Sequence, residues 1–435
     1  MKKTQLPKAH PMDSIMSQEN NIRPNLTPAW LTPDYVEEKL CLYFKDDSLN
    51  LENLDIKPAL GNGENYASVM TRINVEYTMK NTNRKESTRF LVKTTFADRD
   101  PAAKVLMDYG VYTREMDMYE QILPKLADLV RNELGDSRKL FACTVNVDRK
   151  RDSIMFEDLS LDRYRVADRL KKLDLEHTYL VLEKLANFHA AGAALAERQQ
   201  GIFAKNFDRG FFNQHTRGYE PIMRNLLMAL SRSLELEPVL RERYQAKIDR
   251  LVDNVMDYGE RSTSIVPGDF VTLAHGDLWT TNVMFQYDDE GHPTNAIFID
   301  FQFSAWNSPA IDLHYFFSTA LQENIRLKNQ PEFIQFYYYR LKDALKAVNY
   351  SGQVPSLFAF HQQFRNRAFY AAFASLIFEP SMSYNGKEEA SMEQIMSSSE
   401  KGMRFKDDLY QSEEIRKKMH FTLPFLDQLG LLDIM

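Results

Sequence analysis

Three oxygen-bearing side chains follow one another closely along the chain. In HGDLWTTN, residues 275–282, Asp277 lies five positions before Asn282, and a later apolar run ends on Asp300. Such residues can form a turn or bind a hard cation. They also match what phosphoryl transfer from ATP requires, with one aspartate at the acceptor hydroxyl and an asparagine and a second aspartate on Mg²⁺. The order therefore favours a catalytic loop followed by a metal-binding carboxylate.

The same chemistry needs a cation on the α- and β-phosphates of ATP. Lys93 stands in the middle of the apolar run FLVKTTF, where a lysine loses its hydration at a cost unless it is paired. Glu115 lies in the next helical stretch, on the face that carries Tyr112 and Tyr119. Because a strand lysine paired with a helix glutamate orients ATP phosphates in kinases, we expect Lys93 to pair with Glu115.

A loop over the phosphates belongs directly before the first long strand, and GNGENYASV occupies that place at residues 61–69. The segment contains Gly61 and Gly63 but no third glycine, so it departs from the glycine-rich pattern of protein kinases. Gly63 and Ser68 are its nucleotide-binding candidates.

Hydrophobic periodicity predicts the elements that position these residues. Alternation over residues 66–79 predicts a strand, and residues 88–96 predict the strand that returns beside it. A helix is expected after Pro101, ending near residues 123–126, and two further strands follow it. One face of the first strand carries Val69, Thr71, Ile73, Val75 and Tyr77.

A strand-rich front half followed by a helix-rich back half predicts an α+β protein with two lobes. The 435 residues are also too many for one small core. We expect a flexible N-terminal tail over residues 1–27, a small antiparallel β-rich N-lobe over residues 28–158, and a large, mostly helical C-lobe over residues 159–435.

Composition excludes several classes of partner. The formal net charge of −7 argues against nucleic acid or an anionic membrane surface as the main partner. The most apolar stretch, residues 368–378, is too short to span a bilayer, and the N-terminus has no secretory pattern. The two cysteines, Cys41 and Cys143, indicate reduced thiols rather than a disulfide or a zinc site. A cytoplasmic protein without membrane insertion is expected, and its oligomeric state stays open.

Along its length the chain carries, in this order, the segments LVKT, REMDMYEQILP, IMFEDLS, LAHGDLWTTNVMF and IDFQ with the later SPAIDLHYFF. Together these segments resemble the group of aminoglycoside phosphotransferases and choline kinases, within the protein-kinase-like fold. The chain looks most like the ecdysteroid kinase-like branch of that group, over roughly residues 28–420. His-Gly-Asp replaces the His-Arg-Asp of protein kinases, and Asp-Phe-Gln replaces Asp-Phe-Gly, as in small-molecule kinases.

The resemblance implies ATP and Mg²⁺ as cofactors and a role for each candidate residue. FEDL, residues 156–159, would be the hinge between the lobes, with the backbone around Glu157 and Leu159 meeting adenine. Asp312 would hold the backbone of the catalytic loop. The remaining implied roles are Asp277 as catalytic base, Asn282 and Asp300 as Mg²⁺ ligands, Lys93 on the phosphates and Glu115 as its partner.

The leading interpretation is a kinase that phosphorylates a hydroxyl of a small, apolar acceptor, such as an ecdysteroid or a xenobiotic alcohol or glycoside. The alternative is a catalytically silent, kinase-shaped protein that binds nucleotide or ligand. A protein kinase is disfavoured, because the stretch between Asp300 and Asp312 is too short for an activation segment. His275 is expected to brace the loop rather than bind metal, because no second histidine lies nearby.

Overall fold

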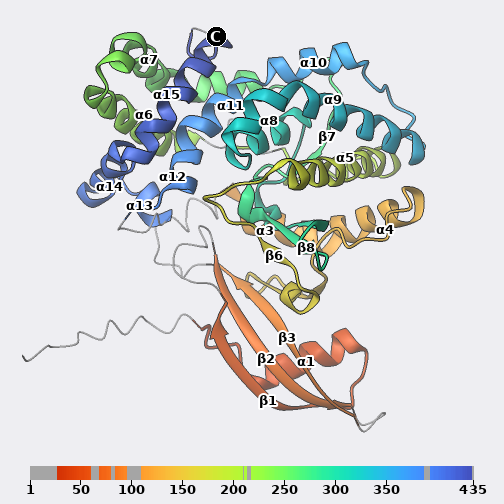
Figure 1. The fold of residues 1–435 in the computed structure, drawn as a ribbon. Coiled ribbons are helices and arrows are strands. Elements are labelled where there is room, and N and C mark those ends of the chain that lie inside the picture. Colours follow the sequence, from red (N-terminus) through yellow and green to blue (C-terminus); the bar gives the residue numbers. More distant parts are fainter. Residues whose placement is uncertain are drawn as a thin grey trace, which may run out of the picture.

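The computed structural model describes residues 27–59, 68–79, 84–95, 109–208, 210–212, 217–386 and 392–433. Figure 1 shows a small lobe built on a sheet and a larger lobe made mainly of helices. Each lobe has its own cluster of buried apolar side chains. The expected α+β architecture with two lobes is therefore confirmed.

Five antiparallel strands form the sheet of the small lobe. They are β1 (Leu49–Pro58), β2 (Val69–Met79), β3 (Arg84–Thr94), β4 (Thr144–Asp148) and β5 (Ser153–Glu157). Their spatial order is β1-β2-β3-β5-β4, so β3 lies at the centre. The predicted hairpin is β2 and β3, with Arg72 opposite Leu91 and Met70 opposite Lys93.

The two faces of this sheet have different neighbours. Helix α1 (Pro33–Phe44) begins after Thr32, whose hydroxyl caps Tyr35 N–H, and its apolar side packs on one face of the sheet. Ile73 and Val75 of β2 are fully buried there, as the alternation predicts. The opposite face, which carries Lys93, is turned toward the large lobe, where the lysine contacts Asp300.

A long, irregular helical stretch connects β3 to β4. It comprises α3 (Val111–Asp117), a π-helical turn (Met118–Ile122) and α4 (Leu123–Glu133). The sequence prediction that this stretch ends near residues 123–126 is wrong. Pro124 stands in the first turn of α4, directly after the π-helical turn, and the chain stays helical through it.

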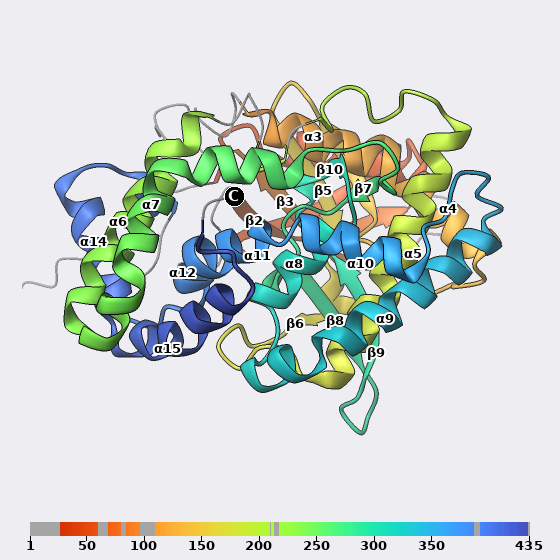
Figure 2. The same cartoon turned by 90° about the horizontal axis from the view of Figure 1, so that it is seen from above.

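Helix α5 (Leu175–Arg198) is the centre of the large lobe, and it packs against α9 (Glu323–Ala347) and β7 (Thr272–Ala274). Helix α6 (Glu220–Ser233) packs against α7 (Pro238–Thr263) and α14 (Glu400–Gln411). Figure 2 shows the α6–α7 pair at one side of the lobe. A Cβ on Gly192 would lie 2.9 Å from Thr272 Oγ1, so glycine lets α5 approach β7 closely. The helices are α5 (Leu175–Arg198), α6 (Glu220–Ser233), α7 (Pro238–Thr263), α8 (Ala310–Thr319), α9 (Glu323–Ala347), α10 (Leu357–Asn366), α11 (Phe369–Phe373), α12 (Glu379–Ser383), α13 (Met392–Met396), α14 (Glu400–Gln411) and α15 (Glu413–Gln428).

Two small sheets in the large lobe carry the motif residues. Strand β7 (Thr272–Ala274) pairs with β10 (Ala305–Asn307), and β8 (Val283–Tyr287) pairs with β9 (Pro293–Phe298) and with the short β6 (Arg165–Val166). The HGDLWTTN segment is the loop from β7 to β8, and Asp300 follows β9. Among the described residues, no helix combines the length and apolarity needed to cross a membrane.

Candidate active site

The catalytic-loop candidate makes a sharp turn at Gly276. Its φ of +87° lies in the left-handed region, and a Cβ there would overlap the carbonyl group of Phe303. Any side chain at this position would therefore displace either the loop or the segment after β9. The close approach therefore requires glycine at this position.

Asp312, at the start of α8, holds the backbone of this loop. Its two carboxylate oxygens accept the N–H groups of His275 at 2.7 Å and Gly276 at 2.8 Å. His189 Nε2 lies 3.0 Å from the same carboxylate, and His189 Nδ1 lies 2.5 Å from the Tyr337 hydroxyl. Burial opposes ionisation of Asp312, but the hydrogen bonds from His189 and the loop keep its pKa below the usual range. The contact matches the role that the resemblance implied for Asp312.

His275 links the loop to the end of β9. Its Nε2 lies 3.0 Å from the carbonyl oxygen of Ile299, and its Nδ1 accepts the N–H of Asp277 at 3.3 Å. With one ring nitrogen donating and the other accepting, the imidazole is neutral, and burial also lowers its pKa. Since both nitrogens are engaged, His275 braces the loop and has no lone pair left for a metal.

Asp277 and Asn282 are in direct contact. The amide Nδ2 of Asn282 donates to the backbone oxygen of Asp277 at 2.8 Å and to its Oδ2 at 3.2 Å. The Tyr315 hydroxyl, from α8, also donates to the Asp277 carboxylate. Burial and the negative charge of Asp300 raise the pKa of Asp277 to about 8, although these donors and Lys93 oppose the shift.

Tyr315 was missed in the sequence, although a signal was present. It lies three residues after Asp312 in the segment SPAIDLHYFF, so the two side chains share one side of a helix. A residue on that face of α8 is therefore directed to the same loop that Asp312 holds.

Lys93 joins the two lobes. Its Nζ lies 2.7 Å from Glu115 Oε1, on α3, and 3.0 Å from Asp300 Oδ1. Burial alone would lower the pKa of Lys93, but the charges of Asp300 and Glu115 have the larger effect and raise it. Lys93 therefore stays in the ammonium form. Burial raises the pKa of Glu115 to about 7 against the opposing charge of Lys93. The predicted Lys93–Glu115 pair is present, and Asp300 completes a cluster of one cation and two carboxylates.

The other nucleotide-binding candidates lie in different settings. Gly63 is outside the described residues, and Ser68 is buried just before β2. The Glu157 side chain binds Lys139 Nζ at 2.8 Å and Cys143 N–H at 2.7 Å. Its backbone N–H donates to the Cys143 carbonyl oxygen at 3.0 Å, so a ligand would have to use the Glu157 carbonyl oxygen. Leu159 is buried, and its carbonyl oxygen accepts Tyr164 N–H at 3.1 Å.

Asn282 and Asp300 form a donor set that suits Mg²⁺. Because the Asn282 Nδ2 donates to Asp277, its Oδ1 is left as a possible ligand. Asp300 uses Oδ1 for Lys93, which leaves its second oxygen for a cation. Hard oxygen donors of this kind, completed by water and phosphate, are what Mg²⁺ prefers. A cation here would also offset the repulsion between Asp277 and Asp300.

A mostly apolar cavity of about 90 Å³ adjoins Asp277. Side chains from α6, α12 and α13 line this cavity, so its wall is formed by segments that are distant in sequence. Its described lining residues are Phe211, Tyr219, Ile222, Met223, Leu226, Asp277, Trp279, Phe303, Tyr315, Ile377, Phe378, Ser381, Met382, Ile395 and Met396. A second cavity of about 590 Å³ shares Phe211 and Phe303 with the first and is also lined by Gly276.

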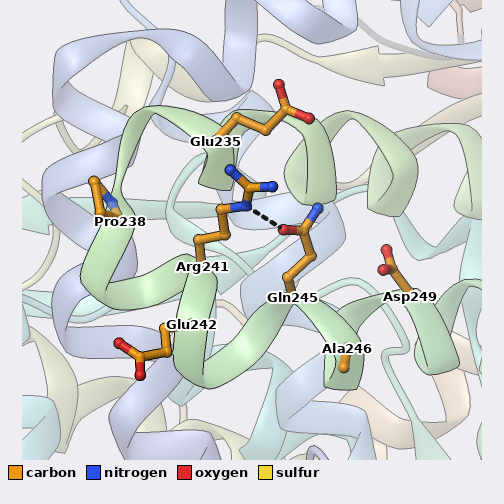
Figure 3. Close-up of a pocket in the computed structure, with 7 residues that line it drawn as sticks. All are labelled: Glu235, Pro238, Arg241, Glu242, Gln245, Ala246 and Asp249. Atoms are coloured by element: carbon orange, nitrogen blue, oxygen red, sulfur yellow. Dashed lines mark hydrogen bonds between the residues drawn. The ribbon is translucent and has the colours of Figure 1, made fainter.

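A third hollow, of about 480 Å³, lies on the surface at the corner between α6 and α7. Figure 3 shows its side chains, among which Arg241 Nε donates to Gln245 Oε1 at 3.0 Å. The hollow carries charges of both signs and contains none of the motif residues. We assign it no part in the chemistry.

A search of curated proteins finds no match. Among solved structures, an ethanolamine kinase from Plasmodium vivax is 11% identical, with a TM-score of 0.38 over 92% of this chain and 93% of that one. A choline kinase from Streptococcus pneumoniae is 13% identical, with a TM-score of 0.32 over 78% of this chain and 98% of that one. Likenesses at this level carry no functional argument.

The family comparison is decisive, because it covers the elements that form the site. The model of the ecdysteroid kinase-like family matches residues 62–350, which is about two-thirds of the chain. This span contains the strand of Lys93, the helix of Glu115, the catalytic-loop candidate and Asp300. The two-lobed, kinase-like chain therefore belongs to the ecdysteroid kinase-like family.

Proposed function

We propose that the protein is an ATP-dependent kinase that phosphorylates a hydroxyl group of a small, mostly apolar alcohol. The observation that carries the proposal is the position of Asp277. Its carboxylate lies at the wall of a cavity whose other lining side chains are largely apolar. A carboxylate in such a setting can receive the proton of an acceptor hydroxyl while the rest of the acceptor is held by apolar contacts.

Each residue of the site has a chemical task in this proposal. Asp277 accepts the proton of the acceptor hydroxyl, and Tyr315 and Asn282 fix the orientation of its carboxylate. Lys93, held by Glu115, binds the phosphates of ATP. We also propose that the N-lobe ends at Asp158, directly after β5, so that the segment around Glu157 and Leu159 is the hinge.

Asn282 and Asp300 would hold Mg²⁺ bound with ATP. The metal would supply positive charge that balances the phosphate oxygens during transfer. Lys93 supplies further positive charge from the small lobe, where burial and Glu115 keep its ammonium group fixed.

The lining of the 90 Å³ cavity supports an apolar acceptor such as an ecdysteroid or a xenobiotic alcohol or glycoside. Ligand sites usually enclose about 300–1,000 Å³, so acceptor binding requires these side chains to move. Met223, Met382 and Met396 suit that requirement, because methionine is flexible and fills irregular space. A polycationic acceptor fits poorly, since Asp277 is the one carboxylate among the described lining residues.

A catalytically silent binding protein is the second candidate. The presence of Asp277 in contact with Asn282, and of Lys93 in contact with Asp300, favours an enzyme, because a binding protein has no need of a base. We further propose a cytoplasmic location, in which the free thiols of Cys41 and Cys143 stay reduced. Detoxification and hormone inactivation are both compatible with the acceptor class.

The test is acceptor-dependent release of ADP. The full-length protein with ATP and Mg²⁺ is incubated with steroid alcohols, phenolic and terpenoid alcohols, glycosides, choline and an aminoglycoside, and products are identified by mass spectrometry. We expect phosphorylation of at least one apolar alcohol and none of the aminoglycoside. ATP binding without transfer to any acceptor would favour the silent binding protein, and transfer to choline alone would contradict the acceptor class.

A further inference from the structure

Arg72 of β2 lies on the same face of the sheet as Lys93. The register of the hairpin sets Arg72 opposite Leu91 and Met70 opposite Lys93. Directly opposed residues share a face, and residues two apart along a strand also share it. The neighbouring positions Thr71 and Ile73 are buried on the other face, toward α1. Arg72 is therefore directed to the side on which Lys93 meets Glu115 and Asp300.

The guanidinium group of Arg72 is anchored at the proposed hinge. Arg72 Nε donates to Asp158 Oδ2 at 2.8 Å, and the Asp158 side chain is only 2% exposed. The other oxygen of Asp158 accepts the N–H of Ser160 at 3.0 Å, which fixes the carboxylate in turn. The Arg72 side chain itself is 31% exposed. A buried carboxylate thus holds a partly exposed, planar cation beside the segment that connects the lobes.

This bond leaves most of the guanidinium group available. Only Nε of Arg72 is hydrogen bonded, so in the described part of the chain the two terminal nitrogens have no partner. Arg89 Nε, from β3, lies 3.9 Å from the same Asp158 oxygen, which is too long for a hydrogen bond. Asp158 therefore orients Arg72 specifically, while Arg89 only adds positive charge nearby.

We propose that Arg72 forms one wall of the nucleobase site and that its guanidinium group stacks on the face of the purine ring. The inference rests on the proposed nucleotide site. Since Lys93 marks the phosphate end of that site, the base lies toward the hinge, where Asp158 holds Arg72. Because Arg72 projects from the sheet of the small lobe, its side chain would contact the face of the purine ring. The backbone groups of the hinge would contact the edge of the ring. Planar guanidinium groups stack well on aromatic rings, and lysine cannot replace this geometry.

Stacking predicts a specific pattern of affinities. Every purine has a similar face, so Arg72→Ala should weaken the binding of ATP and of GTP by the same factor, about 5- to 30-fold. Inorganic tripolyphosphate has no base, and its affinity should stay unchanged. Arg72→Lys should weaken both nucleotides nearly as much as alanine does, because a point charge does not stack. Asp158→Asn should have a smaller effect in the same direction, since an amide oxygen can still accept from Arg72 Nε.

Isothermal titration calorimetry of the full-length protein without acceptor tests these expectations with ATP, GTP and tripolyphosphate, each with Mg²⁺. Arg89→Ala is the matched control, because it removes the same charge beside the same carboxylate, and it should leave all three affinities nearly unchanged. Thermal unfolding of each variant checks that the fold persists. If Arg72→Ala loses as much affinity for tripolyphosphate as for ATP, Arg72 binds the phosphates and the proposal is overturned. Unchanged ATP affinity in Arg72→Ala would also overturn it. If the wild-type protein binds no nucleotide, the proposed function itself fails.

Discussion

Lys93 and Asp300 are separated by 207 residues, yet Lys93 Nζ lies 3.0 Å from Asp300 Oδ1. One residue belongs to the central strand of the small lobe, and the other follows β9 in the large lobe. The ion pair therefore sets the distance between the phosphate-binding and metal-binding candidates. Because Lys93 also binds Glu115 at 2.7 Å, its ammonium group is held by two carboxylates.

The Lys93–Glu115 pair should act as a unit in nucleotide use. Lys93→Met should raise the KM for ATP and lower kcat/KM severely, whereas Glu115→Gln should act in the same direction but more mildly. The amide of glutamine keeps a hydrogen-bond acceptor for Lys93 and loses only the charge. Losses in the double variant should be clearly smaller than the sum of the single losses, because each change removes the same interaction. Additive losses in steady-state kinetics would show that the two side chains do not cooperate.

The metal assignment predicts that Asp300→Ala abolishes turnover while the protein stays folded. Asp300 lies at the edge of a loop, with its side chain 24% exposed, so its removal leaves no large cavity. The measurement is the initial rate over a Mg²⁺ titration, together with circular dichroism. Asp289→Ala is the control, because this carboxylate in the turn between β8 and β9 is 90% exposed and has no assigned role. Equal rates for Asp300→Ala and wild type at saturating Mg²⁺ would contradict the assignment.

Much of the site could be predicted from the sequence because its signals are local. Asp277 and Asn282 lie five residues apart in a single loop, and the alternating residues of β2 lie on the two faces of a single strand. Contacts between distant segments have no such signal. The Arg72–Asp158 bond joins residues 86 positions apart, and nothing in either local pattern indicates it. The cavity beside Asp277 likewise depends on methionines from α6, α12 and α13, whose meeting is a property of the tertiary fold.

Helix boundaries were harder to predict for a related reason. The sequence predicts that the helical stretch ends near residues 123–126, a segment that contains Pro124, and a proline usually ends a helical pattern. The π-helical turn over Met118–Ile122 changes the hydrogen-bonding register before the proline, and α4 then continues to Glu133. Helix α5, in contrast, contains no proline and runs without interruption from Leu175 to Arg198.

Tyr315 should assist Asp277 as a positioning residue. Tyr315→Phe keeps the ring at the wall of the cavity and removes only the hydroxyl that donates to the Asp277 carboxylate. A single hydrogen bond of this kind contributes about 1–1.5 kcal/mol, so kcat should fall by about 5- to 10-fold. The KM for ATP should stay unchanged, because Tyr315 lies on the acceptor side. A change confined to the KM for ATP would contradict this role.

His314 should make the fold less stable in mild acid. It is buried in α8, its Nε2 lies 2.7 Å from the Phe364 carbonyl oxygen, and its ring stacks on Phe364. Burial is the main reason that its pKa falls to about 4, and the nearby charge of Arg367 acts in the same direction. The unfolded chain, with an ordinary histidine pKa near 6.5, binds more protons between these values. The free energy of unfolding should therefore be fully retained above about pH 6.5 and fall by about 3 kcal/mol toward pH 4.

Urea unfolding at pH 7.5 and pH 5 measures this effect. His314→Gln keeps a donor for the Phe364 carbonyl group and cannot titrate, so its unfolding free energy should fall less between the two pH values than that of the wild type. His361→Gln is the matched control, because His361 is exposed on α10. A pH dependence of His314→Gln that equals the wild-type dependence would remove His314 as the cause.

Asp277→Asn separates catalysis from binding. The substitution keeps the size of the side chain and removes its basic charge, so the acceptor hydroxyl loses the group that takes its proton. Positioned acid–base groups contribute about 10²–10⁴-fold to rate, or about 3–5 kcal/mol of transition-state stabilisation, and the loss in kcat should fall in that range. ATP affinity should survive, because the phosphates are assigned to Lys93 and the metal to Asn282 and Asp300.

ATP affinity by calorimetry and acceptor-dependent turnover must both be measured on the wild type and on Asp277→Asn. The kinase and the silent binding protein predict different combinations of these two results. If the protein is an enzyme, Asp277→Asn binds ATP as tightly as the wild type does but transfers almost no phosphate to the acceptor. A silent binding protein gives no acceptor-dependent ADP release from the wild type, and the substitution then has no activity to remove. Near-normal transfer by Asp277→Asn to an acceptor already verified with the wild type would show that Asp277 is not the base. In that case the contacts of Asn282 and Tyr315 with its carboxylate would serve only to shape the loop.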